Sequence, residues 1–163
     1  MPSVDGRGST TGPPTVGPPL TARTLPDLMP LSATLGIRFG QLGPDRVAGE
    51  VDWHPRLCTA GGVMHGGTLV ALADSVAGVC AYLNLPTGAV TSTIELTVNF
   101  LAAVRRGTVQ AVARPLSVGR SVIVVQTDLH LMEPACANGT HGGERTGERP
   151  AVGIVVQSQI VLR

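Results

Sequence analysis

An acidic residue and a glycine in the middle of the chain are the residues best suited to chemistry. Asp74 is the only charged residue between Asp52 and Glu95 apart from Arg56, and it follows Gly66 by eight positions. Its neighbours three and four positions away are small and apolar, and a carboxylate in such surroundings is costly unless it pairs or reacts. An acid at the margin of the core, satisfied by a hydroxyl, is the alternative. The chemical interpretation is a carboxylate that attacks a carbonyl carbon or activates water.

The residues after Gly66 have the spacing of a helix with one buried face. Apolar residues recur at helical intervals, namely Leu69, Leu72, Ala73, Val76 and Cys80. We therefore expect a helix to begin near Gly66. Its first turn has free backbone N–H groups and the positive end of the helix dipole, which together can hold a carbonyl oxygen.

One copy of this helix cannot bring both groups to one substrate. Eight residues of helix separate Gly66 from Asp74 by about 12 Å. A reacting carboxylate must lie within about 3.5 Å of the carbonyl carbon or its water, and the polarising N–H about 3 Å from the carbonyl oxygen. Two copies related by a twofold axis satisfy both distances, so we expect a homodimer with paired, composite sites.

The segment His65-Gly66-Gly67, with an acid nine residues after the histidine at Asp74, resembles the signature of hotdog-fold thioesterases. The downstream stretch 93–101 resembles the strand that follows the central helix in the branch like the phenylacetyl-CoA thioesterase of phenylacetate breakdown. The likeness covers most of the chain from about Leu31. It implies an α+β hotdog fold, in which a curved antiparallel sheet wraps around one long central helix.

The resemblance implies hydrolysis of an aryl-acyl or medium-chain acyl-CoA to the free acid and CoA. Asp74 would be the nucleophile or general base, and the Gly66 N–H of the partner subunit would polarise the carbonyl. Thr93 would help to hold the attacking water or the carboxylate, although a polar residue on a strand is an equally good interpretation. No cofactor is expected, because CoA belongs to the substrate. We expect the homodimer to assemble further into a homotetramer, as a dimer of dimers.

Further residues would contact the substrate. His65 would orient the loop or touch the sulfur side of the thioester, next to Gly67 at the helix start. Thr59 occupies a place where the family usually has Asn or Gln, which leaves the substrate class and the rate open. A turn resembling the family's contact with coenzyme A comprises Gly119, Arg120 and Ser121, although a solvated arginine is an equally good account of that turn.

The sequence before and after the helix predicts the other elements that position these residues. Residues 1–24 are rich in Gly and Pro and are expected to be a disordered leader, followed by the hotdog domain over 25–163. Residues 25–35 favour a short amphipathic helix that carries Leu28, Leu31 and Leu35 and is interrupted by Pro30. Alternating residues over 37–39 and 47–53 predict two strands.

Four more strands are predicted after the helix. They are residues 90–100, a strand from Val109 ended by Pro115, residues 121–131 and residues 151–162, with a long insertion over 133–150. One face of the first is expected to hold Val90, Ser92, Ile94, Leu96, Val98 and Phe100. The last is expected to alternate through Val152, Ile154, Val156, Ser158 and Ile160.

Composition excludes several classes of protein. Charged residues make up 14%, aromatic residues 2%, and the net charge is +1, which does not favour nucleic-acid binding. No apolar run is long enough to span a membrane, and no signal peptide is evident. Three unpaired cysteines favour a reduced, cytoplasmic protein. Metal-ligand spacing, the serine nucleophile elbow and the P-loop are all absent, so no metal site is expected.

Two other functions remain open at this stage. A hotdog hydratase or dehydratase would use an Asp and a His close together in a loop, whereas His65 and Asp74 are nine residues apart across a helix. A non-catalytic acyl-CoA binder would be consistent with Thr59 in place of the usual amide.

Overall fold

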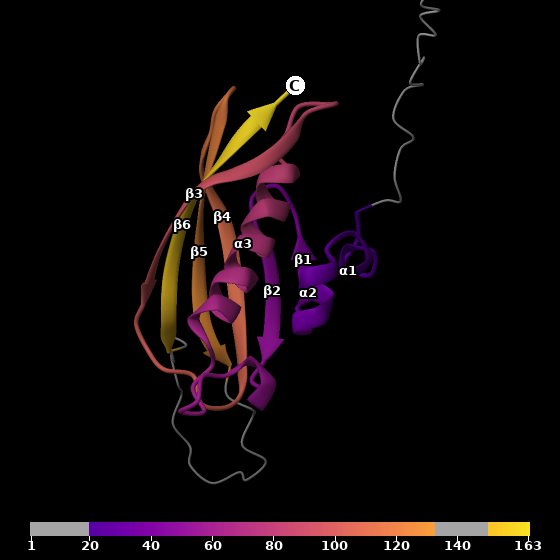
Figure 1. Ribbon diagram of the computed structural model, residues 1–163. Coiled ribbons are helices and arrows are strands. Elements are labelled where there is room, and N and C mark those ends of the chain that lie inside the picture. Colours follow the sequence, from indigo (N-terminus) through magenta and orange to yellow (C-terminus); the bar gives the residue numbers. More distant parts are fainter. Residues whose placement is uncertain (1–19, 133–149) are drawn as a thin grey trace, which may run out of the picture.

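A six-stranded antiparallel sheet with one long helix against a face forms the body of the molecule (Figure 1). The computed structural model describes residues 20–132 and 150–163. The strand order is β1-β2-β4-β5-β6-β3, so β1 and β3 are the edges. The elements in chain order are α1 (Leu25–Leu28), α2 (Pro30–Leu35), β1 (Arg38–Leu42), β2 (Val47–Asp52), the short 3-10 helix η1 (Pro55–Leu57), α3 (Gly66–Tyr82), β3 (Val90–Phe100), β4 (Thr108–Val118), β5 (Val122–Met132) and β6 (Ala151–Leu162).

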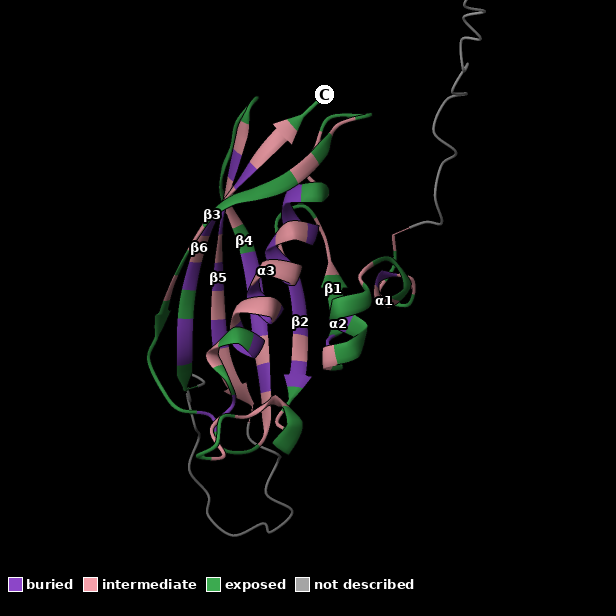
Figure 2. Ribbon diagram, viewed as in Figure 1, coloured by how far each residue is buried: buried purple, intermediate pink, exposed green. Residues whose placement is uncertain are grey.

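The core lies between α3 and the sheet. Leu72, Val76 and Cys80 of α3 are fully buried, as their helical spacing predicts. Gly49 of β2 allows the close approach of the helix, because a Cβ atom there would lie 2.8 Å from Val76 Cγ2. Figure 2 shows that burial concentrates on α3 and the central strands, whereas β3, α1 and α2 are largely intermediate or exposed. This arrangement confirms the α+β class and the order of two strands, a long helix and four strands.

The N-terminal helical segment is interrupted at Pro30, as predicted. The chain forms two short helices, because Met29 between them leaves the helical conformation before Pro30. Leu28 and Leu31 are 49% and 64% exposed, so the predicted amphipathic face is not buried in the single chain. Leu20 and Ala22 pack against the core. Of the leader predicted over residues 1–24, residues 1–19 lie outside the described residues.

Strand β3 contains a bulge that the alternating sequence does not reveal. Thr93 pairs with Gln159 and Glu95 with Ser158, so Ile94 is the extra residue. The expectation of one uninterrupted apolar face over residues 90–100 is therefore wrong. Thr93 contacts the helix before the bulge, and Leu96 packs against the core after it.

Two other strands also depart from the expected pattern. In β6 the buried residues are Val152, Gly153, Val155, Gln157 and Gln159. Val152 is therefore buried as predicted, whereas the rest of the predicted face, through residues 154, 156 and 158, is not. Strand β4 continues past Pro115 to Val118, because a register shift at the proline absorbs its missing N–H. The inward face of β5 is confirmed. The insertion expected over residues 133–150 lies, up to residue 149, outside the described residues.

Candidate active site

Asp74 lies at the centre of a hydrogen-bonded cluster that joins α3 to β3 and β6. The Thr93 hydroxyl and the Gln157 side-chain amide both donate to Asp74 Oδ1, each at 2.9 Å. Oδ2 has no hydrogen-bond partner among the described residues. One oxygen of the carboxylate is thus fixed, and the other is available to react.

A second layer of hydrogen bonds sets the direction of the first. The Gln159 amide donates to Thr93 Oγ1 at 2.7 Å, and Thr91 Oγ1 donates to Gln159 Oε1 at 3.2 Å. Thr93 therefore accepts from Gln159 and gives its single proton to Asp74. This order requires an acceptor at Oδ1, which an ionised carboxylate provides.

The carboxylate opens onto an apolar groove of about 1170 Å³. The groove runs between the C-terminal half of α3, the segment around α1, and the chain from Leu83 into β3. Asp74 is the only charged residue in its lining. Most of the other lining residues are apolar, including Leu25, Met29 and Val79. Such a groove suits an apolar acyl group whose reacting end lies beside Asp74.

The start of α3 offers a backbone donor. His65 caps the helix, since its Nδ1 accepts the Gly67 N–H at 2.8 Å. The Gly66 N–H has no hydrogen-bond partner among residues 20–132 and 150–163. A side chain at Gly66 would meet the ring of Phe100, with a Cβ atom 2.9 Å from Cζ.

The loop before α3 is held by contacts from both sides. Trp53 Nε1 donates to the Gly62 carbonyl at 3.2 Å, and Arg105 Nη1 donates to the Gly61 carbonyl at 3.1 Å. Gly62 has φ +70°, a conformation that favours glycine. Thr59 closes the same turn, because its N–H and its hydroxyl both donate to the Val63 carbonyl. The predicted contact of Thr59 with substrate stays a prediction.

The residues of the predicted coenzyme A turn do not line the groove. Residues 119–121 connect β4 to β5, where the Gly119 N–H donates to the Val122 carbonyl and the Ser121 carbonyl accepts from Val161. This is the end of the sheet where β6 finishes. The structure therefore brings Asp74 and Thr93 together, keeps His65, Gly66 and Gly67 at the helix start, and leaves Gly119, Arg120 and Ser121 in a separate turn.

Sequence reasoning missed Gln157 and Gln159. Both side chains are at most 1% exposed, yet both carry polar groups that reach the site. The sequence did contain a signal for them, because residues two positions apart on a strand point to the same face of the sheet. Two amides on one face of an otherwise apolar strand are unusual for a core.

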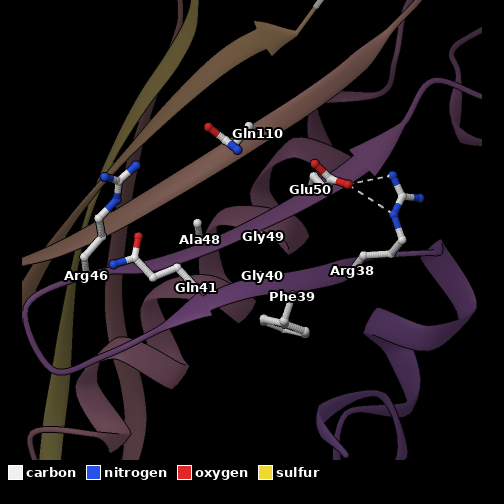
Figure 3. Close-up of a pocket in the computed structure, with 9 residues that line it drawn as sticks. All are labelled: Arg38, Phe39, Gly40, Gln41, Arg46, Ala48, Gly49, Glu50 and Gln110. Atoms are coloured by element: carbon white, nitrogen blue, oxygen red, sulfur yellow. Dashed lines mark hydrogen bonds and ion pairs between the residues drawn. The ribbon is translucent and has the colours of Figure 1, made fainter. Parts of the chain in front are cut away.

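A smaller cavity of about 270 Å³ lies against β1, β2 and β4 (Figure 3). Its polar side chains include Arg38 and Glu50, which form an ion pair at 3.0 Å. None of the predicted site residues lines it. Within the described part of the chain, no three His, Cys, Asp or Glu side chains cluster as metal ligands would. No helix there is long and apolar enough to cross a membrane.

Comparison with known proteins identifies the family. Residues 61–136 match the model of the thioesterase superfamily. The 1,4-dihydroxy-2-naphthoyl-CoA hydrolase of Escherichia coli is 30% identical over 95 residues, which are 58% of this chain and 70% of that protein. The chain belongs to the thioesterase superfamily. Its classification as a thioester hydrolase of the hotdog group is thereby confirmed.

Other similar proteins agree with this membership. The proofreading thioesterase EntH of Cronobacter turicensis is 31% identical over 86 residues, which cover 53% of this chain and 63% of that protein. The crystal structure of thioesterase HI1161 from Haemophilus influenzae aligns with a TM-score of 0.74 and 25% identity. That alignment covers 90% of this chain and 93% of the other. In this superfamily member, the hydrogen-bonded acid and the apolar groove form the candidate active site.

Proposed function

We propose that this protein hydrolyses an acyl-CoA, with Asp74 as nucleophile or general base in a homodimer whose two sites are composite. One observation carries the proposal: Asp74 lines an apolar groove, its Oδ1 is held by two donors, and its Oδ2 has no partner among the described residues. A carboxylate with one fixed oxygen and one open oxygen is oriented to act on a carbonyl group placed in that groove.

Two routes are compatible with this arrangement. In the covalent route, Oδ2 attacks the carbonyl carbon, the C–S bond breaks with its electron pair on sulfur, and water then hydrolyses the mixed anhydride. In the water route, Oδ2 takes a proton from water, the resulting hydroxide attacks the carbonyl carbon, and a proton passes to the leaving sulfur. Both routes place negative charge on the carbonyl oxygen, which needs a donor.

The proposed donor is the N–H of the partner's Gly66. Within one protomer it lies about 12 Å from Asp74 along the helix, but it is free of internal hydrogen bonds in the described residues. The edge strand β3 supports pairing with a second copy, since Val90, Ile94 and Phe100 are half or more exposed. A dimer of dimers remains part of the proposal.

The substrate is proposed to be an aryl-acyl or medium-chain acyl-CoA. The apolar lining of the groove supports the acyl part. The name of the E. coli relative, a naphthoyl-CoA hydrolase, supports both the aryl group and the CoA part. The likeness to the phenylacetyl-CoA branch points in the same direction. The Gly119–Ser121 turn would contact coenzyme A, which enters as part of the substrate, so the reaction needs no cofactor.

The contacts of His65 argue against a hydratase. Its ring caps α3 through Gly67, while Asp74 contacts Thr93 and Gln157, so His65 and Asp74 do not pair with each other within one protomer. The polar cluster around Asp74 also favours catalysis over simple binding, because an apolar ligand needs no oriented carboxylate.

The test is thiol release from a panel of acyl-CoA esters. We expect wild-type turnover with aryl-acyl or medium-chain esters and a loss of about 10³-fold in kcat for Asp74→Asn. The variant should keep the fold, because an asparagine oxygen can still accept from Thr93 and Gln157. The exposed Asp45→Asn is the matched control. Wild-type activity in Asp74→Asn would exclude the assigned role.

A further inference from the structure

Gln157 of β6 contacts Asp74, the candidate catalytic acid, but does not line the groove. It extends from β6 toward α3, is 0% exposed and does not line the groove. Its Nε2 donates to Asp74 Oδ1, whereas its buried Oε1 has no hydrogen-bond partner in the part of the chain that the structure describes. Only the Nε2 end of this amide therefore forms a hydrogen bond, and its acceptor is Asp74.

A buried amide with one unpaired end is a poor choice for stability. An unsatisfied buried acceptor loses its hydration without compensation, and an apolar side chain of similar size avoids that loss. Stability alone therefore does not explain a glutamine at this position. Its one hydrogen bond, to the acid, is the remaining reason for it.

The two donors on Oδ1 also constrain the carboxylate geometrically. Thr93 approaches from the edge strand β3 and Gln157 from the adjacent β6. Two donors on one oxygen, from two strands, fix the plane of the carboxylate and direct Oδ2 into the groove. The Gln157 amide cannot be reversed, because its oxygen would then face the carboxylate oxygen.

We propose that Gln157 is a positioning residue that holds Asp74 Oδ1, so that Oδ2 is the oxygen that reacts. Gln157 touches no substrate and acts only through Asp74. This inference rests on the proposed function of Asp74. It gives Gln157, a residue of β6, a role that none of the site residues predicted from the sequence has.

Over residues 20–132 and 150–163, no other charged side chain is hydrogen-bonded or ion-paired to Asp74. Helix α3 carries no second charged residue, and β6 has no ionisable residue. Strand β3 contributes Glu95, which is exposed and accepts from Thr97. The buried, helix-facing positions of β2, β4 and β5 are apolar apart from Thr127.

Gln157→Met tests the proposal, with Gln126→Met as the matched control. Gln126 also donates to an aspartate at 2.9 Å, but on β5 and to Asp128, away from the groove. For Gln157→Met we expect kcat to fall by about 10–100-fold, with KM changed less than twofold and Tm equal or higher. Gln126→Met should leave kcat unchanged.

A structural role for Gln157 predicts the opposite pattern, a lower Tm with kcat per folded molecule unchanged, and this result would overturn the proposal. If Gln157→Met does not fold, the isosteric Gln157→Glu decides. Its carboxyl group can donate only while protonated, so kcat relative to wild type should fall as pH rises. A pH-independent ratio would overturn the proposal. Failure of wild-type turnover, or full activity in Asp74→Asn, would instead reject the proposed function itself.

Discussion

At the scale of single residues, the site depends on the direction of hydrogen bonds. Thr93 has one proton and gives it to Asp74, because Gln159 already donates to its oxygen. The threonine therefore orients the acid and does not offer a proton to water while this bond is intact. Its contribution should be separable from that of Gln157.

Thr93→Val should lower both activity and stability. It removes a donor from Asp74 and leaves the buried Gln159 amide without its acceptor, which costs about 1–3 kcal/mol. We expect kcat to fall about tenfold or more, together with a lower free energy of unfolding in urea. Thr93→Ser retains the hydroxyl and should restore most of both quantities. Wild-type values in Thr93→Val would show that the hydroxyl does not contribute.

Some site residues could be predicted from the sequence and others could not. Asp74 and Gly66 were evident because their spacing lies within one helix, where position follows from local geometry. Gln157 and Gln159 were missed because alternation defines two faces of a strand without stating which one is buried. The polar contacts of an acid with distant strands depend on register, which a single sequence does not specify.

At the scale of elements, the beginning of α3 has two separable properties, its backbone donor and its contact with Phe100. Gly66 is the first residue of the helix, a position that accepts proline. Proline there removes the N–H and keeps a helical φ. Alanine adds a similar Cβ contact with Phe100 and keeps the N–H.

Gly66→Pro should therefore lose about 10²–10³-fold in kcat, the usual effect of removing one donor to a developing oxyanion. Gly66→Ala should lose much less, although both variants must displace the Phe100 ring. Circular dichroism and Tm would establish that both remain folded. Similar activity in the two variants would mean that the Gly66 N–H is not the donor.

The order of the elements followed from the sequence, but their irregularities did not. Helix α3 and strand β5 have one clear apolar phase, so their buried faces were correctly predicted. In β3 either set of alternating residues could face the core. The bulge at Ile94 switches from one set to the other, so that Thr93 faces the helix before it and Leu96 packs against the core after it. Proline usually ends a strand, but at Pro115 a register shift lets β4 continue.

At the scale of the whole molecule, the proposed composite site predicts that two inactive variants complement each other. A protomer with Asp74→Asn still supplies Gly66, and one with Gly66→Pro still supplies Asp74. Random pairing of the two in equal amounts makes half of the dimers mixed, and each mixed dimer has one intact site. We therefore expect about a quarter of wild-type activity after mixing and reassembly.

Each variant reassembled alone is the control and should remain inactive. Analytical ultracentrifugation before and after mixing would establish that dimers are present and have exchanged. Exchange without recovered activity would place both groups of a site in one protomer, contrary to the proposed dimer. The sequence predicted this assembly by distance alone, through the eight residues of helix between the donor and the acid.

The bulge at Ile94 has a consequence for how such enzymes diverge. Before it, β3 presents Thr91 and Thr93 to the amides around the acid, and after it the strand packs Leu96 and Val98 against the core. Because the extra residue separates the two halves, mutations in the first half can alter selectivity while the second half preserves folding. Natural variation in acyl preference should accumulate on the N-terminal side of that one residue.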